Sequence, residues 1–302
     1  MGTPEFAVPS LQILHHARYP ILAVVTAAEK PRGRGRKVSS TAVGEFASKN
    51  SLPLLQPDSL RDPDFIDQLR KLKPDILVVV AFRILPLEVF GIPRIASFNL
   101  HASSLPAYRG AAPINRAIMN GESMTGLTTF VLADEVDTGG ILLQQSFPIH
   151  PNENAGSLHD RLAVEGSKMV LDTVRLLEAG KAKPVPQDDS LATPAPKIRK
   201  EDCRIDWTRL APSIHNQIRG LSPHPGSFTT HNGKGLKIYK STPTQIRSAG
   251  SPGTLTVGRE FLRVASGNFL LSIEELQQEG KRRMMVDEFL RGYEMTDGEK
   301  FE

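Results

Sequence analysis

The 302-residue sequence contains one cysteine, Cys203, and one tryptophan. A single cysteine excludes an internal disulfide and any metal site built from several cysteines, and it favours a reducing, intracellular compartment. No apolar run approaches the ~20 residues of a transmembrane helix, and residues 1–27 lack the basic start and cleavage site of a secretory signal. With 39% hydrophobic and 23% charged residues, the composition is typical of a globular protein of two ordinary domains.

The sequence also lacks the common phosphate-binding loops. It has no GxGxxG, so a domain that uses a nicotinamide cofactor would lack its phosphate loop. Gly233–Gly235 has neither the upstream glycine nor the Ser or Thr of a nucleotide P-loop. His150 and His159 are too scattered to form a ligand set with the acidic cluster Asp134–Asp137. Neither a metal site nor a pair of catalytic carboxylates is predicted.

In the first 180 residues, apolar strand-like runs alternate with amphipathic, helix-like segments. The strand-like runs are residues 21–27, 75–81 and 96–100. This alternation predicts a mainly parallel α/β sheet. Residues 129–132 and 141–149 are separated only by a short polar turn, so we expect an antiparallel or looped pair at the end of that sheet. A long helix is predicted from about residue 157 to residue 177.

The composition changes near residue 181 to Pro, Lys, Asp and Ser. We predict a semi-extended linker at residues 183–204, between one domain at residues 1–182 and another at residues 205–302. The second domain begins with a predicted helix near residues 213–221 and continues with short β-rich runs. These runs are residues 226–229, 236–240, 253–257, 261–264 and 269–274. Short strands separated by glycine turns predict a small β-barrel.

The net charge of +4 is unevenly distributed along the chain. Residues 1–180 hold 18 Lys and Arg against 18 Asp and Glu, whereas residues 181–283 hold 17 against 9, a net charge of +8. A positive charge of this size can attract a polyanion. The alternative is that the charged side chains form a solvated surface that keeps the protein soluble. Charge alone does not decide between the two interpretations.

A basic loop follows the first predicted strand. Its five cations alternate with glycine and proline: Lys30, Arg32, Arg34, Arg36 and Lys37. A backbone that adapts to phosphates, combined with guanidinium groups that bind them, favours RNA as a ligand. An exposed, solvated loop without a ligand is the alternative.

Two polar clusters suggest the chemistry. Residues 97–106 form an apolar run in which Asn99 and His101 are two residues apart, so on a strand both side chains point to the same side. Residues 134–140 contain Asp137 and two glycines, which indicate a turn or a close approach of the backbone. Together the clusters offer a hydrogen-bond donor, a titratable imidazole and a carboxylate.

The motifs NLHxSxLP at residues 99–106 and DEVDTGG at residues 134–140 resemble those of the folate-dependent formyltransferases. The segments MGTPEFAVPSL, KPRGRGRK, RGAAPINRAI and ATPAPKIRKEDCRIDW narrow the resemblance to the members that formylate methionyl-tRNA, and it covers essentially the whole chain. The resemblance implies an open, Rossmann-like α/β domain followed by an oligonucleotide-binding-like domain. Members carry a strand before the segment that begins here at Met1, so we expect a different start site rather than a different fold.

The resemblance also implies an activity. We expect a cytoplasmic, monomeric enzyme that needs no metal and transfers the formyl group of 10-formyltetrahydrofolate to initiator methionyl-tRNA. Asn99 and protonated His101 can stabilise the developing oxyanion, or His101 can protonate the leaving nitrogen. Asp137 can hold His101 charged and oriented, or relay the proton of the amine through water.

Further site residues are implied by the same resemblance. The implied folate contacts are Phe82, Arg83, Ile84, Leu85, Ser103, Ser104, Leu105 and Pro106. Composition alone would place Phe82, Ile84 and Leu85 in the core instead. The implied tRNA contacts are the five cations of the basic loop, with Arg34 as the key arginine, and Lys237 and Lys240 of the second domain. Lys234, Lys281, Arg282 and Arg283 are compatible with phosphate contacts, although an accessory domain with incidental lysines is the alternative.

Two other functions remain open from the sequence. A formyltransferase acting on a small amine, such as a sugar nucleotide, would keep Asn99, His101 and Asp137 but would need neither the basic loop nor a basic second domain. A non-catalytic RNA-binding protein on a decayed enzyme scaffold would bind RNA without turning over folate, and the intact trio argues against it.

Overall fold

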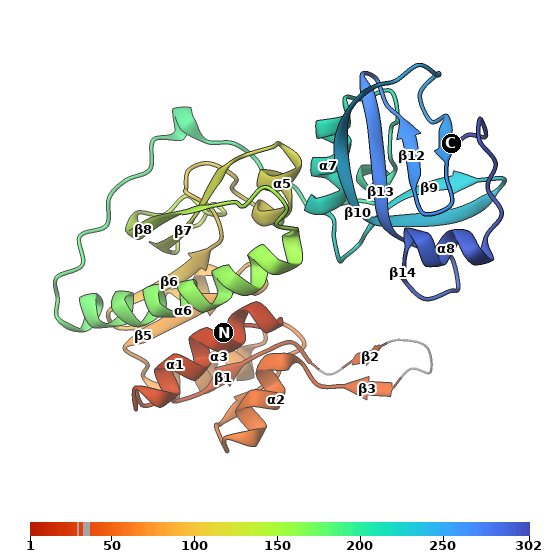
Figure 1. Ribbon diagram of the computed structural model, residues 1–302. Coiled ribbons are helices and arrows are strands. Elements are labelled where there is room, and N and C mark those ends of the chain that lie inside the picture. Colours follow the sequence, from red (N-terminus) through yellow and green to blue (C-terminus); the bar gives the residue numbers. More distant parts are fainter. Residues whose placement is uncertain (29, 33–36) are drawn as a thin grey trace. The chain divides into compact units, whose positions relative to one another are not determined.

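The computed structural model describes residues 1–28, 30–32 and 37–302 (Figure 1). The chain forms two compact units. Unit 1 comprises Met1–Gly110, Thr125–Phe147 and His159–Pro194, and unit 2 comprises Ala111–Met124, Pro148–Leu158 and Ala195–Glu302. Two short pieces from within the predicted first domain, residues 1–182, therefore belong to unit 2, so the units are not separated by a single cut in the sequence.

The main sheet of unit 1 contains the strands that the apolar runs predicted. Its order is β5 (Ile76–Val80), β6 (Ala96–His101), β7 (Met124–Val131) and β8 (Ile141–Pro148). β6 runs parallel to β5 and antiparallel to β7. A separate parallel pair joins β1 (Val24–Val25) to β4 (Leu54–Leu55). The predicted α/β class is confirmed, although β1 is shorter than the predicted run because only its middle residues pair.

Met1 and Gly2 lie between the two sets of strands. The Gly2 N–H donates to the Val25 carbonyl at 3.0 Å, and the Val80 N–H donates to the Met1 carbonyl at 2.9 Å. The Met1 amine donates to the Val78 carbonyl at 2.6 Å, and its complete burial lowers its pKa to about 5. These two residues satisfy backbone groups of β1 and β5 that would otherwise be unpaired.

Helices cover the strands of unit 1 (Figure 1). They are η1 (Glu5–Ala7), α1 (Val8–His16), α2 (Ala42–Lys49), α3 (Pro63–Leu72), α4 (Leu87–Phe90) and α6 (Ala155–Glu178). A further short turn, η2 (Asp189–Leu191), lies in the segment after α6. The Asp62 side chain caps α3 by accepting from the Asp64 N–H at 3.0 Å. Phe65, Ile66 and Leu69 of α3 pack in one core cluster with residues of β1 and β5. The long helix predicted near residues 157–177 is confirmed as α6.

Unit 2 contains an antiparallel sheet and four helical segments. The helical segments are α5 (Pro113–Met119), η3 (Glu201–Cys203), α7 (Ala211–Gly220) and α8 (Val286–Gly292). The strands are β9 (Ser227–His231), β10 (Lys234–Arg247), β11 (Leu255–Val257), β12 (Leu262–Ala265), β13 (Phe269–Gln278) and β14 (Met284–Met285). Their order is β11-β12-β13-β10-β9, with β14 beside β13. The predicted small β domain is confirmed, but strand pairing does not close this sheet into a barrel.

The last residues of the chain span the gap between the edge strands β9 and β11. Thr230 and Glu302 exchange two backbone hydrogen bonds of 3.1 and 3.0 Å, and the Phe301 N–H donates to the Gly253 carbonyl at 2.9 Å. The Phe301 ring is 3% exposed and lies 5.7 Å from the Trp207 ring in the core of unit 2. This segment is short and irregular, so no alternating pattern of apolar residues predicts its role from the sequence.

We predict that Phe301→Ala lowers the free energy of unfolding of unit 2 by about 3–5 kcal/mol, because it removes a buried aromatic ring and loosens the segment between two sheet edges. Urea denaturation followed by the fluorescence of Trp207, the single tryptophan, measures this directly. Glu302→Ala is the control, since Glu302 holds β9 mainly through its backbone. Equal unfolding midpoints for the two variants would contradict the assigned role.

Candidate active site

Asn99 and His101 lie at the end of β6, next to the carboxyl end of the parallel strand β5. Ligands of open α/β sheets bind at the carboxyl ends of the strands. On β6 these residues are opposite Phe130 and Thr128 of β7, respectively. His101 is 6% exposed. Asn99 is partly exposed, and its side-chain amide has no hydrogen-bond partner within the part of the chain that the structure describes, so it is available to a ligand.

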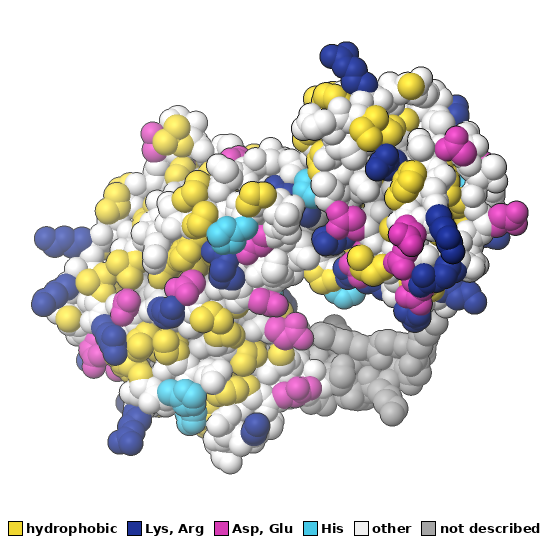
Figure 2. Space-filling model, in the orientation of Figure 1, with side chains coloured by type: hydrophobic (Ala, Val, Ile, Leu, Met, Phe, Trp, Pro, Cys, Tyr) yellow, Lys and Arg dark blue, Asp and Glu magenta, His cyan; other side chains and the backbone are white. Residues whose placement is uncertain are grey.

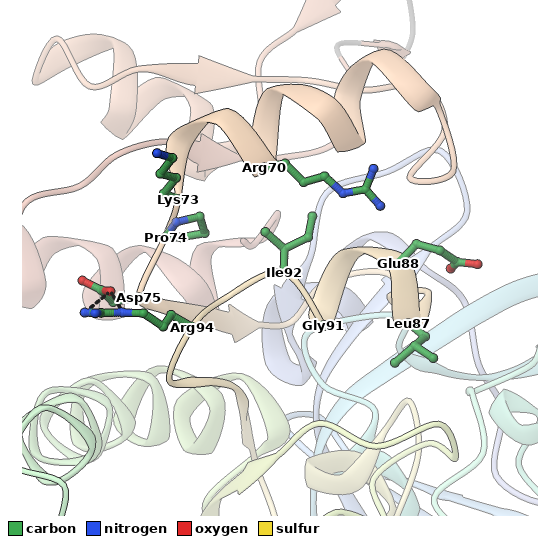
Figure 3. Close-up of a pocket in the computed structure, with 9 residues that line it drawn as sticks. All are labelled: Arg70, Lys73, Pro74, Asp75, Leu87, Glu88, Gly91, Ile92 and Arg94. Carbon is green, nitrogen blue, oxygen red and sulfur yellow. Dashed lines mark hydrogen bonds and ion pairs between the residues drawn. The ribbon is translucent and has the colours of Figure 1, made fainter.

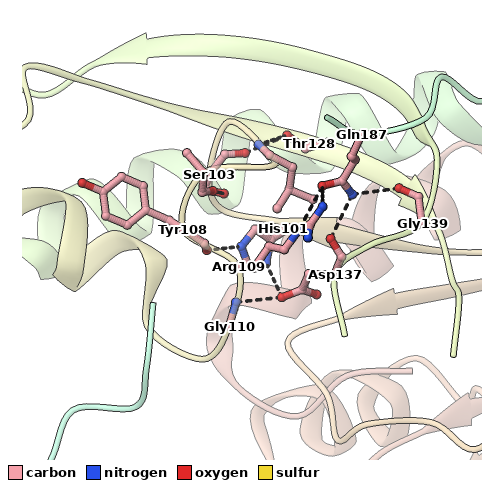
Figure 4. Close-up of polar contacts among 11 residues, drawn as sticks. His101, Ser103, Tyr108, Arg109, Gly110, Thr128, Asp137, Gly139 and Gln187 are labelled. Atoms are coloured by element: carbon pink, nitrogen blue, oxygen red, sulfur yellow. Dashed lines mark hydrogen bonds and ion pairs between the residues drawn. The ribbon is translucent and has the colours of Figure 1, made fainter. Parts of the chain in front are cut away.

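The His101 ring is held between two oxygen acceptors (Figure 4). Its Nε2 lies 2.9 Å from the Tyr108 carbonyl oxygen, and its Nδ1 lies 3.7 Å from Oδ2 of Asp137. A carbonyl oxygen only accepts, so Nε2 carries a proton in every protonation state of this geometry. The Nδ1–Oδ2 separation exceeds hydrogen-bond length. Nδ1 is therefore the ring nitrogen that can exchange a proton or donate to a third partner.

The turn of residues 134–140, here called the catalytic turn because it carries the candidate catalytic residue Asp137, directs the Asp137 carboxylate at His101. Asp137 has a φ of 59°, a left-handed conformation that is uncommon for residues other than glycine. Its Oδ2 accepts from the Gly110 N–H at 2.9 Å, and its side chain is 11% exposed. A Cβ at Gly139 would overlap the Val131 carbonyl oxygen. This bears out the sequence-based expectation that the glycines of this turn allow a close backbone approach.

The segment Ser103–Pro106 is fixed by side chains of β7 and β8. Thr128 Oγ1 donates to the Ser103 carbonyl at 2.7 Å and accepts from the Leu105 N–H at 3.2 Å. Gln144 Nε2 donates to the Leu105 carbonyl at 2.8 Å. The Ser103 and Leu105 side chains are 1% and 2% exposed, respectively. Of the four predicted folate contacts in this segment, these two would act by shaping the backbone rather than by touching a ligand.

Of the other predicted folate contacts, at residues 82–85, all but Phe82 line a hollow of about 580 Å³ in unit 1. Its lining includes Arg83, Ile84 and Leu85, together with Arg61 and with Asp134 from the catalytic turn. The Arg83 guanidinium donates to the carbonyls of residues 57 and 58, and the Ile84 side chain is exposed. The volume is within the range of small-molecule sites.

A second hollow, of about 880 Å³, lies at the opposite end of β5 (Figure 3). Pro74 and Asp75 line it and precede β5, so it lies at the amino end of that strand. Arg94 also lines it and is paired with Asp75 at 2.8 Å. None of the predicted site residues lines this hollow, which places it outside the candidate active site.

The basic loop is described only in part. Residues 30–32 (β2) and 37–39 (β3) form an antiparallel hairpin. Lys30, Arg32 and Lys37 lie on its strands, whereas Arg34 and Arg36 are outside the described residues.

Four of the predicted cations of unit 2 are already bonded to acceptor groups of the protein. Lys240 Nζ lies 2.8 Å from Oε2 of Glu274, and this hydrogen bond raises the pKa of Lys240. Lys237 Nζ donates to the Pro225 carbonyl at 2.7 Å, which leaves its charge in place. Arg282 and Arg283 form ion pairs with glutamates. Figure 2 shows Lys and Arg side chains among Asp and Glu side chains on the visible face of this unit. A count along the sequence therefore overestimates the cations free to bind phosphate.

Gln187 is a contact of the catalytic turn that the sequence did not reveal. It lies in the predicted linker, and its Nε2 donates to the carbonyls of Asp137 and Gly139 at 2.9 and 2.8 Å. No motif surrounds it, and its neighbours are the prolines and aspartates that indicated a linker.

Within residues 1–28, 30–32 and 37–302, no cluster of three or more His, Cys, Asp or Glu side chains could hold a metal ion. In the same ranges, no helix is both long and apolar enough to cross a membrane.

Residues 1–174 match the family model described as formyl transferase, and residues 197–294 match the formyl transferase C-terminal domain. The chain belongs to the formyl transferase family. Among curated relatives, it is 46% identical to a methionyl-tRNA formyltransferase of Syntrophus aciditrophicus, over 99% of this chain and 96% of that one. It is 45% identical to a methionyl-tRNA formyltransferase of Moorella thermoacetica, over 99% and 97%.

Solved structures share the fold at lower identity. An N-formyltransferase from Helicobacter canadensis, in complex with folinic acid and dTDP-3-aminofucose, matches with a TM-score of 0.70 and 22% identity, over 90% of this chain and 97% of that one. HypX from Aquifex aeolicus, in complex with tetrahydrofolic acid, matches with a TM-score of 0.61 and 20% identity, over 84% and 47%. At these identities the comparison supports the fold alone.

Proposed function

We propose that this protein transfers the formyl group of 10-formyltetrahydrofolate to the methionine amino group of initiator methionyl-tRNA, for translation initiation. The observation that carries the proposal is full-length identity of 45–46% to proteins named methionyl-tRNA formyltransferase. The site agrees with it, because an unpartnered amide, an imidazole and a carboxylate meet at the end of β6 in a fold of this family.

The residues present fit a folate. The hollow beside the catalytic turn has the exposed apolar side chain of Ile84, which can cover a flat ring, whereas Leu85 is packed in the core beneath it. It also has the exposed cation Arg61, which suits the carboxylates of a folate tail. A bound folate supplies a formyl group that is already activated for transfer.

The chemistry forms a bond between the methionine nitrogen and the formyl carbon, and breaks the bond between that carbon and the folate nitrogen. Negative charge develops on the formyl oxygen in between. The Asn99 amide is free to donate to this oxygen, and protonated His101 can donate from Nδ1. A fixed donor stabilises such charge more than water does, because it needs no reorientation during the reaction.

One proton must move from the amine to the leaving nitrogen. The Asp137 carboxylate is placed to accept it directly or through one water, since its Oδ2 is 3.7 Å from His101 Nδ1 and is oriented by the Gly110 N–H. The Tyr108 carbonyl keeps the Nε2 proton of His101 in place. His101 therefore acts through Nδ1 alone. Its Nδ1 proton can pass to the folate nitrogen as the bond to the formyl carbon breaks, and the proton that Asp137 took from the amine can then return to Nδ1.

An amino-sugar formyltransferase is the second candidate. The Helicobacter canadensis protein, solved with dTDP-3-aminofucose, shares this fold. Its 22% identity to this chain is about half of the 46% identity of a protein named for methionyl-tRNA, and a sugar substrate would not need a basic hairpin.

A non-catalytic RNA-binding protein would bind tRNA without folate turnover.

The test is incubation of the protein with labelled 10-formyltetrahydrofolate and charged initiator tRNA. We expect label on the methionyl-tRNA, with a turnover that decreases as the salt concentration rises. Label on an amino-sugar nucleotide, with none on the tRNA, would overturn the proposal.

We predict that Asn99→Ala lowers the single-turnover rate by roughly 100-fold or more, as removal of one oxyanion donor does, with little change in tRNA affinity. His101→Ala should be at least as damaging. Asp137→Asn keeps the size of the side chain and removes its charge, so the activity that remains measures an orienting role. Thr138→Ala is the control, because within the described part of the chain Thr138 Oγ1 bonds only to the Glu135 carbonyl, at 3.0 Å. A near-normal rate for Asn99→Ala would contradict the mechanism.

The basic loop and unit 2 should contribute differently to tRNA binding. Arg34→Ala should lower the single-turnover rate even at saturating tRNA, because lost contacts near the aminoacyl end misplace the reacting amine. Lys237→Ala should raise the dissociation constant and flatten its salt dependence by roughly 0.7–0.9 in log-log slope for one lost phosphate contact, at an unchanged saturated rate. Lys240→Ala should do less than Lys237→Ala, because Glu274 already neutralises Lys240.

Single-turnover rates and affinities across a salt series measure all three variants. If Arg34→Ala changes affinity alone, or Lys237→Ala changes the saturated rate alone, the two roles are reversed.

A further inference from the structure

Gln187 lies outside both matched family models, which cover residues 1–174 and 197–294. It is nevertheless a direct neighbour of the catalytic turn (Figure 4). Both hydrogens of its side-chain amide are used, one for the Asp137 carbonyl and one for the Gly139 carbonyl. Gln187 thus binds the turn on both sides of Thr138.

Arg109 fixes the other end of the same amide. Its Nε and Nη2 donate to Gln187 Oε1 at 3.1 and 2.8 Å, and its Nη2 also donates to Asp189 Oδ1 at 2.6 Å. The Arg109 side chain is only 16% exposed. Since Oε1 accepts twice and Nε2 donates twice, the hydrogen-bonding capacity of the Gln187 amide is fully used. A flipped amide would direct its oxygen at two carbonyls, so only one orientation fits.

The residues on either side of Arg109 hold the catalytic pair. The Tyr108 carbonyl accepts from His101 Nε2, and the Gly110 N–H donates to Asp137 Oδ2. Three consecutive residues thus reach His101, Gln187 and Asp137. Because Gln187 returns to the Asp137 backbone, these contacts form a closed ring around the His101–Asp137 pair.

The segment 185–193 is itself attached to unit 1. Val185 and Ile141 exchange two backbone hydrogen bonds of 2.8 and 2.9 Å. At the other end, Thr193 accepts from the Tyr108 N–H through its hydroxyl and from the Arg109 N–H through its carbonyl, both at 2.9 Å. Gln187 is therefore presented by a segment anchored before and after it, not by a free linker.

Asp137 needs this support because its left-handed backbone is unfavourable for a residue with a Cβ. Such conformations are costly for residues other than glycine and persist where surrounding contacts over-determine them. Gln187 bonds the Asp137 carbonyl, and Gly110 bonds its carboxylate. Without Gln187, the Asp137 and Gly139 carbonyls lose the partners that keep the turn in this conformation.

We infer that Gln187, held by Arg109, is a positioning residue that fixes the Asp137 carboxylate relative to His101 Nδ1. The inference rests on the proposed function for its kinetic consequences, and its structural part stands independently. Gln187 acts through Asp137 and needs no contact with a substrate.

Two substitutions test the role. Gln187→Leu removes all four hydrogen bonds, and Gln187→Glu keeps the acceptors for Arg109 while it removes both donors to the turn. Each should lower kcat by roughly 10- to 100-fold with KM values for both substrates within about 3-fold, because small misplacements of a catalytic group cost this much in rate. In an Asp137→Asn background the same substitutions should cause little further loss, because they act through the missing carboxylate.

Asp188→Ala is the matched control. Asp188 is adjacent to Gln187, but among the described residues its carboxylate bonds only to Ser190, at 3.0 and 2.7 Å, so kcat should be unchanged. A normal kcat for folded Gln187→Glu, or an equal loss with and without the Asp137 carboxylate, would overturn the inference.

A second readout does not depend on the activity. The ring-nitrogen NMR resonances of His101 should move in Gln187→Leu and Gln187→Glu but not in Asp188→Ala. If the wild-type protein formylates no tRNA, the proposed function fails, and these resonances alone decide the inference: unmoved signals overturn it and moved signals support it.

Discussion

The site depends on one constraint, the hydrogen bond between His101 Nε2 and the Tyr108 carbonyl. It assigns a proton to Nε2, so Nδ1 is the nitrogen that faces Asp137 and can take part in the reaction. β6 supplies the ring, and the loop after it returns to supply the carbonyl. The same strand also positions the Asn99 side chain, because residues two apart on a strand point to the same side. The described contacts leave its amide available to the oxygen on which charge develops.

Other segments of unit 1 place the Asp137 carboxylate opposite that nitrogen. Asp137 reaches it from a turn with a left-handed residue and with glycine at a position where a side chain would overlap backbone. A turn with such a backbone conformation needs contacts from other segments to stabilise it. Gly110 bonds its carboxylate and Gln187 bonds its carbonyl, while Arg109 connects the two. A segment far along the chain thereby becomes part of the geometry of the site.

Local patterns in the sequence predicted the strands, the long helix α6 and the convergence of Asn99 with His101, because each depends on residues close together in the chain. Predicting Asp137 as the partner of His101 required the family resemblance as well. Three features left no local signal: the Gln187 contacts, the pairing of Lys240 with Glu274, and the closing role of Phe301. Each joins residues more than 30 positions apart through a single side chain or a short irregular segment, so no periodicity marks it.

The most direct test of this account is 15N NMR of histidine-labelled protein, with His101 assigned from His101→Gln. We expect the neutral His101 ring to carry its proton on Nε2, hydrogen-bonded to a carbonyl, with Nδ1 unprotonated. A neutral ring with its proton on Nδ1 would contradict the account, because the Tyr108 carbonyl would then face an unprotonated nitrogen.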